Sequence, residues 1–459
     1  MRLAWFTPWP PQPSGIAGRS AELVPRLAAR DHAIDVFVDE RGVPLERVGD
    51  DAPAAGEVRV SSAHDFVWRH AKQPYDLVVY QVGNSRLHAF VWPYLFRWPG
   101  LVVLHDARLH HARGHAMLSQ NRTADYRAEF RWNHPEAADG FEELAVRGYA
   151  GVYYYEWPMT RAVLASARLV AVHARGARAE LAPVSPADRP IVHIALGSGR
   201  RDLPTEAARR ATRASWCLPA DAIVFGVFGG LTADKRVEPI LRAFAAARAR
   251  APQARLVLGG AVDSQLDLSG LLDALALGDV VTILGPLGDD DFEDAVAAVD
   301  VSLNLRWPTA LEVSGPWLQA LAAGRPTVIV DHAHLSDVPT LDPRTWRRHA
   351  PGPESIEADA AAVAVAVDIL DEEHSLRMAI EMLAADPRLR ARLGATARRY
   401  WEREHTVERM TDDYQRAMAR AAAMPPPSVD LPAHLRPDAL AHAKALLDPF
   451  GAGMLSELA

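Results

Sequence analysis

Short apolar runs alternate with longer amphipathic stretches along most of the chain. Brief β-branched runs separated by helix-length segments indicate parallel sheets whose strands are joined by right-handed helical crossovers. The first half contains predicted strands at Leu3–Phe6, Ala33–Val38, Leu77–Tyr80, Leu101–Leu104, Leu169–Val172 and Ile191–Ala195. The second half contains them at Ile223–Phe228, Arg255–Leu258, Val280–Leu284, Val301–Leu305 and Thr327–Val330. The pattern therefore predicts an α/β protein with two sheets.

The predicted sheets are separated by a polar, Arg-rich segment, Gly197–Pro219, that carries no strand pattern. After Asp337 the pattern predicts helices and no further strand, with a helix start at Asp386-Pro387 and a final helix over Tyr400–Met418. Prolines from Pro425 onward should end that helix. We therefore predict domains at 1–200 and 221–385, a linker at 201–220, crossing helices at 386–423 and a Pro-rich tail at 424–459 with one helical pattern around Ala439–Leu447.

Composition narrows the class of protein. A chain of 459 residues is too long for one ordinary core, which agrees with two domains. The net charge of −8 argues against a nucleic-acid partner, and the single cysteine, Cys217, fits a reducing cytoplasm. No signal peptide or bilayer-spanning run is visible, although docking on a membrane surface stays compatible with the sequence.

The segment from Asn304 to Val330 carries the strongest chemical signal. A predicted strand ends, a loop follows with Glu312, Val313, Ser314 and Gly315, and a helix begins. A carboxylate beside the free N–H groups of a helix N-terminus suits a ligand with hydroxyls at one end and phosphates at the other.

A second anion site is predicted where the strand Ile223–Phe228 runs into Gly229 and Gly230. Lys235 and Arg236 follow near a helix start, where exposed N–H groups and a mobile ammonium can neutralise phosphate. A lysine on a solvated helix start is the structural alternative.

Histidines gather after the strand that ends at Leu104. His105 stands where catalytic groups of open α/β sheets collect, although a histidine can also cap a strand end for structural reasons. His110, His111 and His115 suggest zinc, but no cysteine or His-Glu-x-x-His pattern supports it, so no metal and no cofactor are expected. The triplet Asp289–Asp291 resembles a metal-binding Asp-x-Asp but is better interpreted as a helix cap.

The first predicted strand leads into Ser14-Gly15-Ile16-Ala17-Gly18, with a helix expected from Ser20. Gly15 and Gly18 allow the backbone to approach a phosphate. The alternative is a rigid loop that only turns the chain. The glycine fingerprint of dinucleotide enzymes is missing, which disfavours a nicotinamide oxidoreductase.

Together these motifs resemble the retaining nucleotide-sugar glycosyltransferases of family 4, in the branch with Glu-x-Ser-Gly in its donor loop. The resemblance covers roughly residues 1–420 and implies the GT-B fold: two facing Rossmann-like domains, a cleft between them and a C-terminal helix that crosses back to the N-terminal domain. It implies that residues 1–200 form the acceptor side and 221–385 bind the nucleotide sugar.

The resemblance also implies roles for individual residues. His105 would orient the donor sugar, Lys235 with Arg306 or Arg236 would bind the diphosphate, and Glu312 would bind donor hydroxyls, so that His105, Lys235 and Glu312 form the catalytic set. The leaving phosphate oxygen would itself take the acceptor proton. The remaining predicted donor-binding residues are Gly15, Gly229, Gly230, Leu287, Val313, Ser314 and Gly315, with Leu287 in the backbone stretch that reads the nucleobase.

Two departures from the family pattern keep other functions open. Gly230 stands where the family has arginine, and Gln319 stands near the place of its second glutamate. The expected function is transfer of a hexose, with retention, from a nucleotide diphosphate sugar to a glycan, lipid-linked or small-molecule acceptor, in glycan, lipopolysaccharide, exopolysaccharide or natural-product glycosylation. The alternatives are a catalytically silent GT-B binding protein and a GT-B nucleotide-sugar epimerase.

Overall fold

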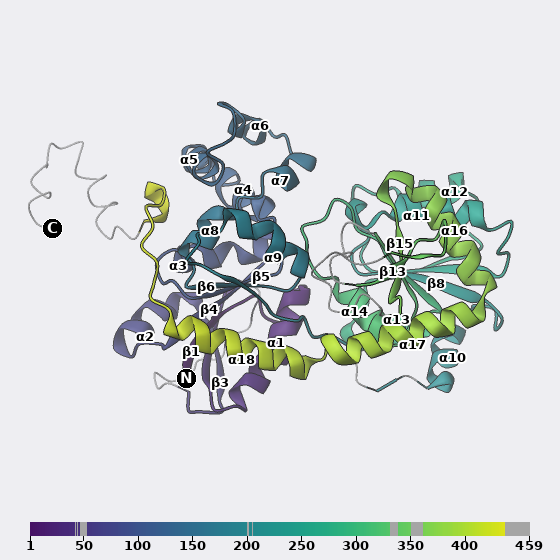
Figure 1. Ribbon diagram of the computed structural model, residues 1–459, viewed down its shortest axis with the longest axis horizontal. Coiled ribbons are helices and arrows are strands. Elements are labelled where there is room, and N and C mark those ends of the chain that lie inside the picture. The colour runs from purple at the N-terminus through teal and green to yellow at the C-terminus, as the bar shows by residue number, and fades with distance from the viewer. Residues whose placement is uncertain are drawn as a thin grey trace, which may run out of the picture.

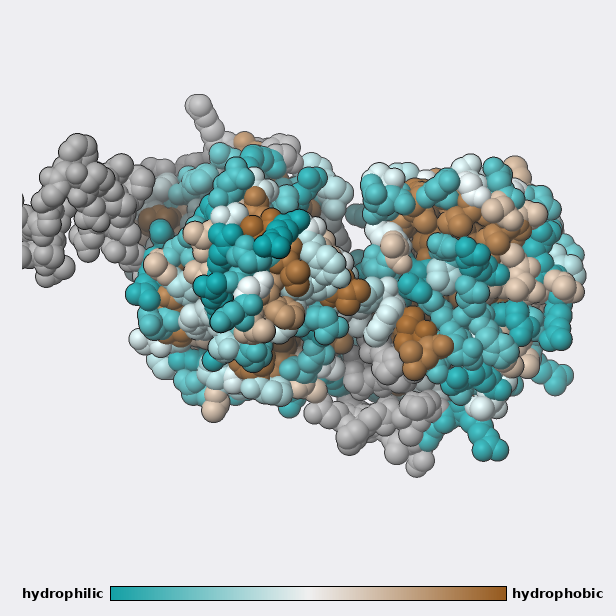
Figure 2. Space-filling view, turned by 90° about the horizontal axis from the view of Figure 1, so that it is seen from above, coloured by the Kyte–Doolittle hydropathy of each residue, from teal (hydrophilic) through white to brown (hydrophobic). Residues whose placement is uncertain are grey.

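The computed structural model describes residues 1–41, 43, 45, 53–199, 202, 203, 205–330, 338–349 and 361–436. These residues form two lobes, each with a mainly parallel sheet covered by helices, and Figure 1 shows the lobes side by side. In the space-filling view a groove divides the two lobes, and we call it the cleft (Figure 2).

The N-terminal lobe is built on a parallel sheet with the strand order β3-β2-β1-β4-β5-β6-β7. Its central strands are buried along their length, which explains why they are continuous apolar runs rather than alternating ones. The strands are β1 (Arg2–Phe6), β2 (Ala33–Val38), β3 (Val58–Ser62), β4 (Leu77–Val82), β5 (Leu101–Leu104), β6 (Leu169–Val172) and β7 (Ile191–His193).

Helices cover both faces of this sheet, and a group of them extends beyond it between β5 and β6. That group has a small core of its own, centred on Tyr126, Phe130 and Tyr153, and projects from the lobe in Figure 1. The helices of the lobe are α1 (Gly15–Ala28), α2 (Phe66–Lys72), α3 (Trp92–Leu95), α4 (His110–Leu118), α5 (Thr123–Asn133), α6 (Glu142–Val146), α7 (Val152–Glu156), α8 (Arg161–Ser166) and α9 (Arg175–Leu181), with 3-10 turns η1 (Ala63–Asp65), η2 (Arg86–Val91) and η3 (Ala182–Val184).

The C-terminal lobe repeats the plan with the strand order β10-β9-β8-β11-β12-β15-β13-β14. Its strands are β8 (Ile223–Phe228), β9 (Ala254–Gly259), β10 (Val281–Gly285), β11 (Val301–Asn304), β12 (Thr327–Val330), β13 (Thr340–Leu341), β14 (Arg348–His349) and β15 (Ala364–Val367). Its helices are α10 (Glu206–Ser215), α11 (Val237–Ala247), α12 (Leu268–Ala274), α13 (Asp289–Ala298), α14 (Gly315–Ala322) and α16 (Glu372–Ala385), with η4 (Ala233–Lys235) and η5 (Ile369–Asp371).

The prediction that strands stop after Asp337 is wrong. β13, β14 and β15 all follow it, and β15 pairs in parallel with β12 inside the sheet. The run Ala364–Val367 is buried along its length, so its alanines serve as small strand residues, although alanine alone favours a helix. The chain also has β3, which the pattern did not reveal because Arg59 interrupts it.

The predicted single helix over Tyr400–Met418 is also wrong. The structure has α17 (Pro387–Glu404) and α18 (Val407–Ala423), separated by His405 and Thr406. The Thr406 side chain caps α18 by accepting a hydrogen bond from the Arg409 N–H, which ends one helix and starts the next. Asp386 caps α17 as predicted, and α18 ends at Ala423 before the prolines.

These two helices carry the chain back across the molecule, as the yellow-green ribbon of Figure 1 shows. α17 packs on α14 in the C-terminal lobe, whereas α18 packs on α1 and on strands β4, β5 and β6 of the N-terminal lobe. One apolar core therefore contains Trp317 and Leu321 together with Trp5 and Tyr414.

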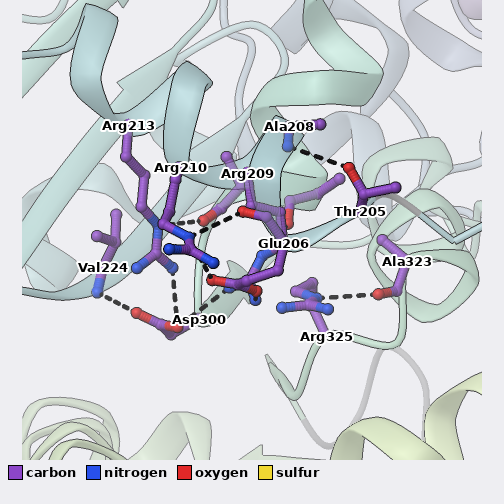
Figure 3. A network of polar contacts seen from close by, with 12 residues as sticks. Thr205, Glu206, Ala208, Arg209, Arg210, Arg213, Val224, Asp300, Ala323 and Arg325 are labelled. Atoms are coloured by element: carbon purple, nitrogen blue, oxygen red, sulfur yellow. Dashed lines mark hydrogen bonds and ion pairs between the residues drawn. The ribbon is translucent and has the colours of Figure 1, made fainter. Parts of the chain in front are cut away.

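The predicted linker contains helix α10, which an ionic network fixes to the C-terminal lobe (Figure 3). Asp300 pairs with Arg213 at 2.8 Å and Arg209 at 3.3 Å, and also accepts the Val224 N–H at 2.8 Å. The network lies where β8 and β11 begin, so it is at the opposite edge of the sheet from the strand ends that hold the site.

The described part of the tail lies along the N-terminal lobe. Leu431 and Leu435 are buried against its core, and Trp132 Nε1 donates to Asp430 O at 2.9 Å. The 3-10 turn η6 (Ala433–Leu435) places His434 Nε2 3.0 Å from Glu129 Oε2. The predicted helical pattern at Ala439–Leu447 lies outside the described residues. Within the described part of the chain, no helix is long and apolar enough to cross a bilayer.

Candidate functional site

The two lobes touch through the loops that follow β5 and β11. The Ala107 N–H donates to the Ala310 carbonyl at 2.7 Å, and Leu311 and Val313 pack against the core of the N-terminal lobe. We call residues 306–315 the donor loop. Because both loops leave the carboxyl ends of parallel strands, the contact brings together the ends where α/β sheets bind ligands.

Lys235 lies at the base of the C-terminal side. Its ammonium Nζ donates to the Phe228 carbonyl at 2.9 Å and would collide with a side chain at position 229, so Gly229 leaves it room. Burial lowers the Lys235 pKa to about 7, and the neighbouring Arg306 adds to the effect. A desolvated ammonium beside a second cation is a site prepared for an anion.

Of the two arginines predicted to assist Lys235, only Arg306 pairs with Glu312. Arg306 pairs with Asp234 at 2.8 Å and with Glu312 at 2.6 Å. Arg236, by contrast, directs its guanidinium to Glu372, with an Nε–Oε1 distance of 2.8 Å. The arrangement favours Arg306 as the partner of Lys235.

Glu312 is held in place from two sides. Its Oε1 pairs with Arg306, while its Oε2 accepts the Ala310 N–H at 2.8 Å and lies 3.3 Å from Thr309 Oγ1. Ser314 then caps α14 by accepting from the Trp317 N–H at 3.3 Å, and nothing lies within 4 Å of a Cβ at Gly315. The start of α14 thus presents open space at the place predicted for phosphate.

His105 follows β5 on the opposite wall. Its Nε2 lies 2.8 Å from Gln81 Oε1, an oxygen that also accepts from the Tyr414 hydroxyl at 3.1 Å. Burial is the main cause that holds the His105 pKa well below its usual range, and the nearby His173 and His88 act in the same direction. The neutral ring donates from Nε2 to Gln81, which leaves Nδ1 as a hydrogen-bond acceptor.

The first loop differs from its prediction. α1 begins at Gly15 rather than at Ser20, because Ser14 caps it by accepting from the Ile16 N–H at 3.2 Å. Gly18 therefore lies inside the helix and cannot bring a loop to a phosphate. Gly15 stays at the helix start, and Ile16 packs toward Gly83 at the end of β4.

The remaining predicted residues lie on the C-terminal lobe. A Cβ at Gly230 would have only Thr232 Cγ2 near it, at 4.0 Å, so the missing family arginine would have room. Leu287 follows β10 and packs with Phe228. Gln319 lines a cavity of about 290 Å³ with Glu293 and Asp294, and no described residue hydrogen-bonds its Oε1. The acids Asp289–Asp291 lie in the first turn of α13, as the dipole argument predicts, but the N-cap residue is Gly288, so they do not cap the helix by a side-chain hydrogen bond.

Sequence reasoning missed Asp106, Asn84, Asp234 and Tyr155. Asp106 Oδ2 accepts the Asn84 N–H at 2.6 Å, and Asp234 anchors Arg306. Burial raises the Tyr155 pKa to about 12, with Asp234 and Glu312 acting in the same direction. Asp106 directly follows His105, so a second polar residue after a strand was a usable signal. Nothing in the sequence indicates that Tyr155 reaches the cleft.

Comparison with known proteins agrees with this arrangement. Residues 222–364 match the family described as "Glycosyl transferases group 1". A D-inositol 3-phosphate glycosyltransferase from Saccharomonospora viridis is 30% identical over 232 residues, which are 46% of this chain and 47% of that protein. The matched region thus spans about half the length of this curated relative.

Solved structures extend the likeness to both lobes. HepE from Anabaena, solved with UDP and glucose, has a TM-score of 0.57 at 16% identity and covers 91% of this chain and 99% of its own. Sucrose-phosphate synthase from Thermosynechococcus elongatus has a TM-score of 0.60 at 19% identity, covering 92% and 98%. The predicted GT-B fold is therefore confirmed: two α/β lobes of the kind found in glycosyltransferases.

Proposed function

We propose that the protein is a retaining hexosyltransferase that uses a nucleotide diphosphate sugar. The observation that carries the proposal is the convergence of Lys235, Arg306 and Glu312 at the start of α14. Such a set binds phosphates at one end and sugar hydroxyls at the other. The resemblance to family 4 and its Glu-x-Ser-Gly branch supports retention.

The chemistry depends on stabilising the leaving diphosphate. As the bond between the anomeric carbon and the phosphate oxygen breaks, negative charge grows on the phosphate, and preorganised cations act most strongly there. Lys235 and Arg306 supply that charge, and the open start of α14 at Ser314 and Gly315 supplies N–H groups. An anion beside Lys235 would raise its pKa again and keep it charged.

The N-terminal lobe would hold the sugar and the acceptor. His105 Nδ1 can accept a hydrogen bond from a hydroxyl of the donor sugar. Glu312 would approach the same sugar from the C-terminal lobe. The comparison with HepE, which is solved with UDP-glucose, supports a nucleotide sugar. We propose a cytoplasmic site of action in glycan, lipopolysaccharide, exopolysaccharide or natural-product glycosylation.

Apolar side chains on the projecting helices support a lipid-linked acceptor. Phe141, Leu144, Tyr149 and Val152 are exposed around α6 and α7. Clustered exposed apolar side chains mark surfaces that bind proteins or membranes. Peripheral membrane contact through these helices fits the acceptor side of the cleft.

The silent binding protein is the second candidate, since Gly230 and Gln319 replace residues that the family uses. A melting-temperature screen with UDP-glucose, UDP-N-acetylglucosamine, GDP-mannose and ADP-glucose, followed by turnover assays with the stabilising donor, separates the two. A ligand at 100 times its dissociation constant stabilises a protein by about 2.7 kcal/mol. Transfer or donor hydrolysis supports the enzyme, stabilisation without turnover supports the binding protein, and conversion of the donor into its epimer supports an epimerase.

A further inference from the structure

The ring of His105 is held by a buried amide, the side chain of Gln81 in β4. Gln81 is 1% exposed, and its Oε1 lies 2.8 Å from His105 Nε2. The hydroxyl of Tyr414 in α18 lies 3.1 Å from the same oxygen. One oxygen of Gln81 therefore accepts hydrogen bonds from two groups, one in the loop after β5 and one in the returning helix.

This contact decides which nitrogen of the His105 ring carries the hydrogen. An amide oxygen accepts hydrogen bonds and donates none, so it selects the form with hydrogen on Nε2. No described residue hydrogen-bonds Nδ1, and that atom is not sealed from solvent. The ring thus presents an oriented acceptor nitrogen on the side away from Gln81.

Tyr414 is itself fixed by packing. Its ring centroid lies 5.6 Å from that of Trp5 in β1 and 6.4 Å from that of His173 at the end of β6. The helix that carries it, α18, packs on β4, β5 and β6. The direction of the hydroxyl is therefore set by the core of the lobe, and a fixed donor in turn fixes the amide of Gln81.

The groups around His105 keep its ring uncharged. Burial is the main cause that lowers its pKa, and His173, whose ring centroid is 4.6 Å away, and His88 lower it further. Those two histidines are also neutral at pH 7, because burial lowers their pKa to about 4. Burial raises the Tyr414 pKa, so its hydroxyl keeps its proton. Within the described part of the chain, no carboxylate is bonded to the ring.

We propose that Gln81 and Tyr414 are positioning residues for His105, a role that rests on the proposed transferase function. They keep the ring neutral with its hydrogen on Nε2, and so present Nδ1 as the acceptor for a hydroxyl of the donor sugar. The ring takes up no proton, and the leaving phosphate oxygen still receives the proton of the attacking hydroxyl. An amide suits this role better than a carboxylate, which would favour the charged ring.

Gln81→Glu tests the role, because it keeps the size and an acceptor oxygen but adds a group that titrates. When the pair of side chains holds one extra proton, the ring is charged or the carboxyl donates to Nε2. Nδ1 carries a hydrogen in both cases and can no longer accept one from the sugar. When the extra proton leaves at higher pH, the wild-type arrangement returns.

Turnover is measured from pH 5.5 to 9.0 with the saturating donor selected by the melting screen. The rate of the variant is divided by the wild-type rate at each pH. This division removes the titrations that both proteins share, such as those of Asp106 and Lys235, whose pKa values burial moves to about 7. We expect the ratio to fall by up to about tenfold per pH unit below the pKa of the pair, and to approach one above it. The dissociation constant for UDP should stay within about threefold of the wild-type value.

A ratio near one over the whole range would overturn the inference. A lowered ratio that does not change with pH would do the same, because it would show a structural role only. Melting curves report whether the buried carboxylate disturbs the fold.

Two further variants remove hydrogen bonds without adding a charge. Gln81→Leu should lower turnover toward the level of His105→Ala and not below it. Tyr414→Phe leaves Gln81 bonded to the ring, so its loss should be smaller, about 2- to 10-fold, the scale of one hydrogen bond.

The double variant shows whether Gln81 acts through the ring. Adding Gln81→Leu to His105→Ala should change turnover by less than about twofold, because the residue that it positions is already missing. A further loss as large as that of Gln81→Leu alone would mean that Gln81 acts independently of His105, against the inference.

Gln73→Glu is the matched control. It makes the same substitution at an exposed position before β4, at the opposite edge of the sheet from the site, and should keep a ratio near one at every pH. A wild-type protein that turns over a nucleotide sugar while all Gln81 and Tyr414 variants match it would leave the transferase intact without the positioning role. A wild-type protein that binds no nucleotide sugar and turns none over would overturn both.

Discussion

At the scale of single residues, the candidate site combines Lys235, whose ammonium donates to the Phe228 carbonyl, with Arg306, which is paired with Asp234 and Glu312. Lys235 and Glu312 could be found from sequence because each stands in a motif with a turn or helix start beside it. Asp234 could not be assigned in the same way, because its significance comes from an ion pair with Arg306, which is distant in the sequence, whereas Asp106 left a signal as the second polar residue after a strand. Arg236 and Arg306 were indistinguishable until the Glu372 ion pair separated them.

Lys235→Ala tests the diphosphate contact. We expect turnover at saturating donor to fall by roughly 10²- to 10³-fold, the scale of one lost charge-stabilising donor. Lys235→Arg should recover only part of the rate, because a planar guanidinium does not superpose on an ammonium. Lys72→Ala, on the surface of α2, is the control, and melting curves report folding. An unchanged rate in the Lys235→Ala protein would place the diphosphate contact elsewhere.

His105→Ala should affect turnover more than nucleotide binding. The ring lies on the N-terminal wall, bonded to Gln81, whereas the nucleotide is expected on the C-terminal lobe. We expect turnover to fall at least about tenfold while the dissociation constant for UDP, measured calorimetrically, changes by less than about threefold, since 1.4 kcal/mol corresponds to tenfold. Weakened UDP binding with normal saturated turnover would make His105 a nucleotide ligand.

At the scale of elements, most of the parallel strands could be predicted from the sequence. The strands β13, β14 and β15 and the break between α17 and α18 could not. Runs of β-branched residues bounded by turns can be recognised as strands in the sequence. The run Ala364–Val367 contains two alanines, and its strand conformation depends on burial by its neighbours. Thr406 caps α18 at the break between α17 and α18, and residues 197 and 198 also contact the break. Such contacts join residues about two hundred positions apart.

Gly197→Ala tests that contact. A Cβ at position 197 would lie 2.7 Å from Thr406 O and 2.8 Å from Val407 Cα, which are backbone atoms that cannot rotate away. Overpacking of this kind costs about 1–3 kcal/mol, so the melting temperature should fall. Gly278→Ala is the matched control, because nothing lies within 4 Å of its Cβ. Equal melting temperatures for the two variants would show that the helix junction yields easily.

At the scale of the molecule, several histidines are buried in uncharged form. Burial is the main cause that lowers the pKa of His88, His173 and His405 to about 4. Above pH 6.5 these histidines are neutral in both the folded and the unfolded chain, so their protonation does not change the free energy of unfolding. Below that value the unfolded chain takes up protons first, which favours unfolding by ~1.4 kcal/mol per histidine for each pKa unit of difference.

We therefore expect the melting temperature to fall steadily as the pH drops from 6.5 toward 4. His405→Asn, whose amide can still donate to Leu196 O in place of Nδ1, should show a shallower decline. His374→Asn, on the exposed side of α16, is the control and should follow the wild type. A melting temperature that stays constant between pH 6.5 and 4.5 would contradict this account.

The junction beneath the cleft has a further consequence for how the chain is assembled. The chain leaves the N-terminal lobe near Ser198 and returns near His405, and these two points are bonded, with the Ser198 N–H 3.2 Å from His405 O and Trp401 Nε1 2.5 Å from Ser198 O. In topological terms the C-terminal lobe is an insertion whose entrance and exit adjoin. Domain insertion is tolerated where the two ends of the inserted unit lie close together. The C-terminal lobe is therefore connected to the rest of the chain as an inserted domain is, with its entry and its exit at one place.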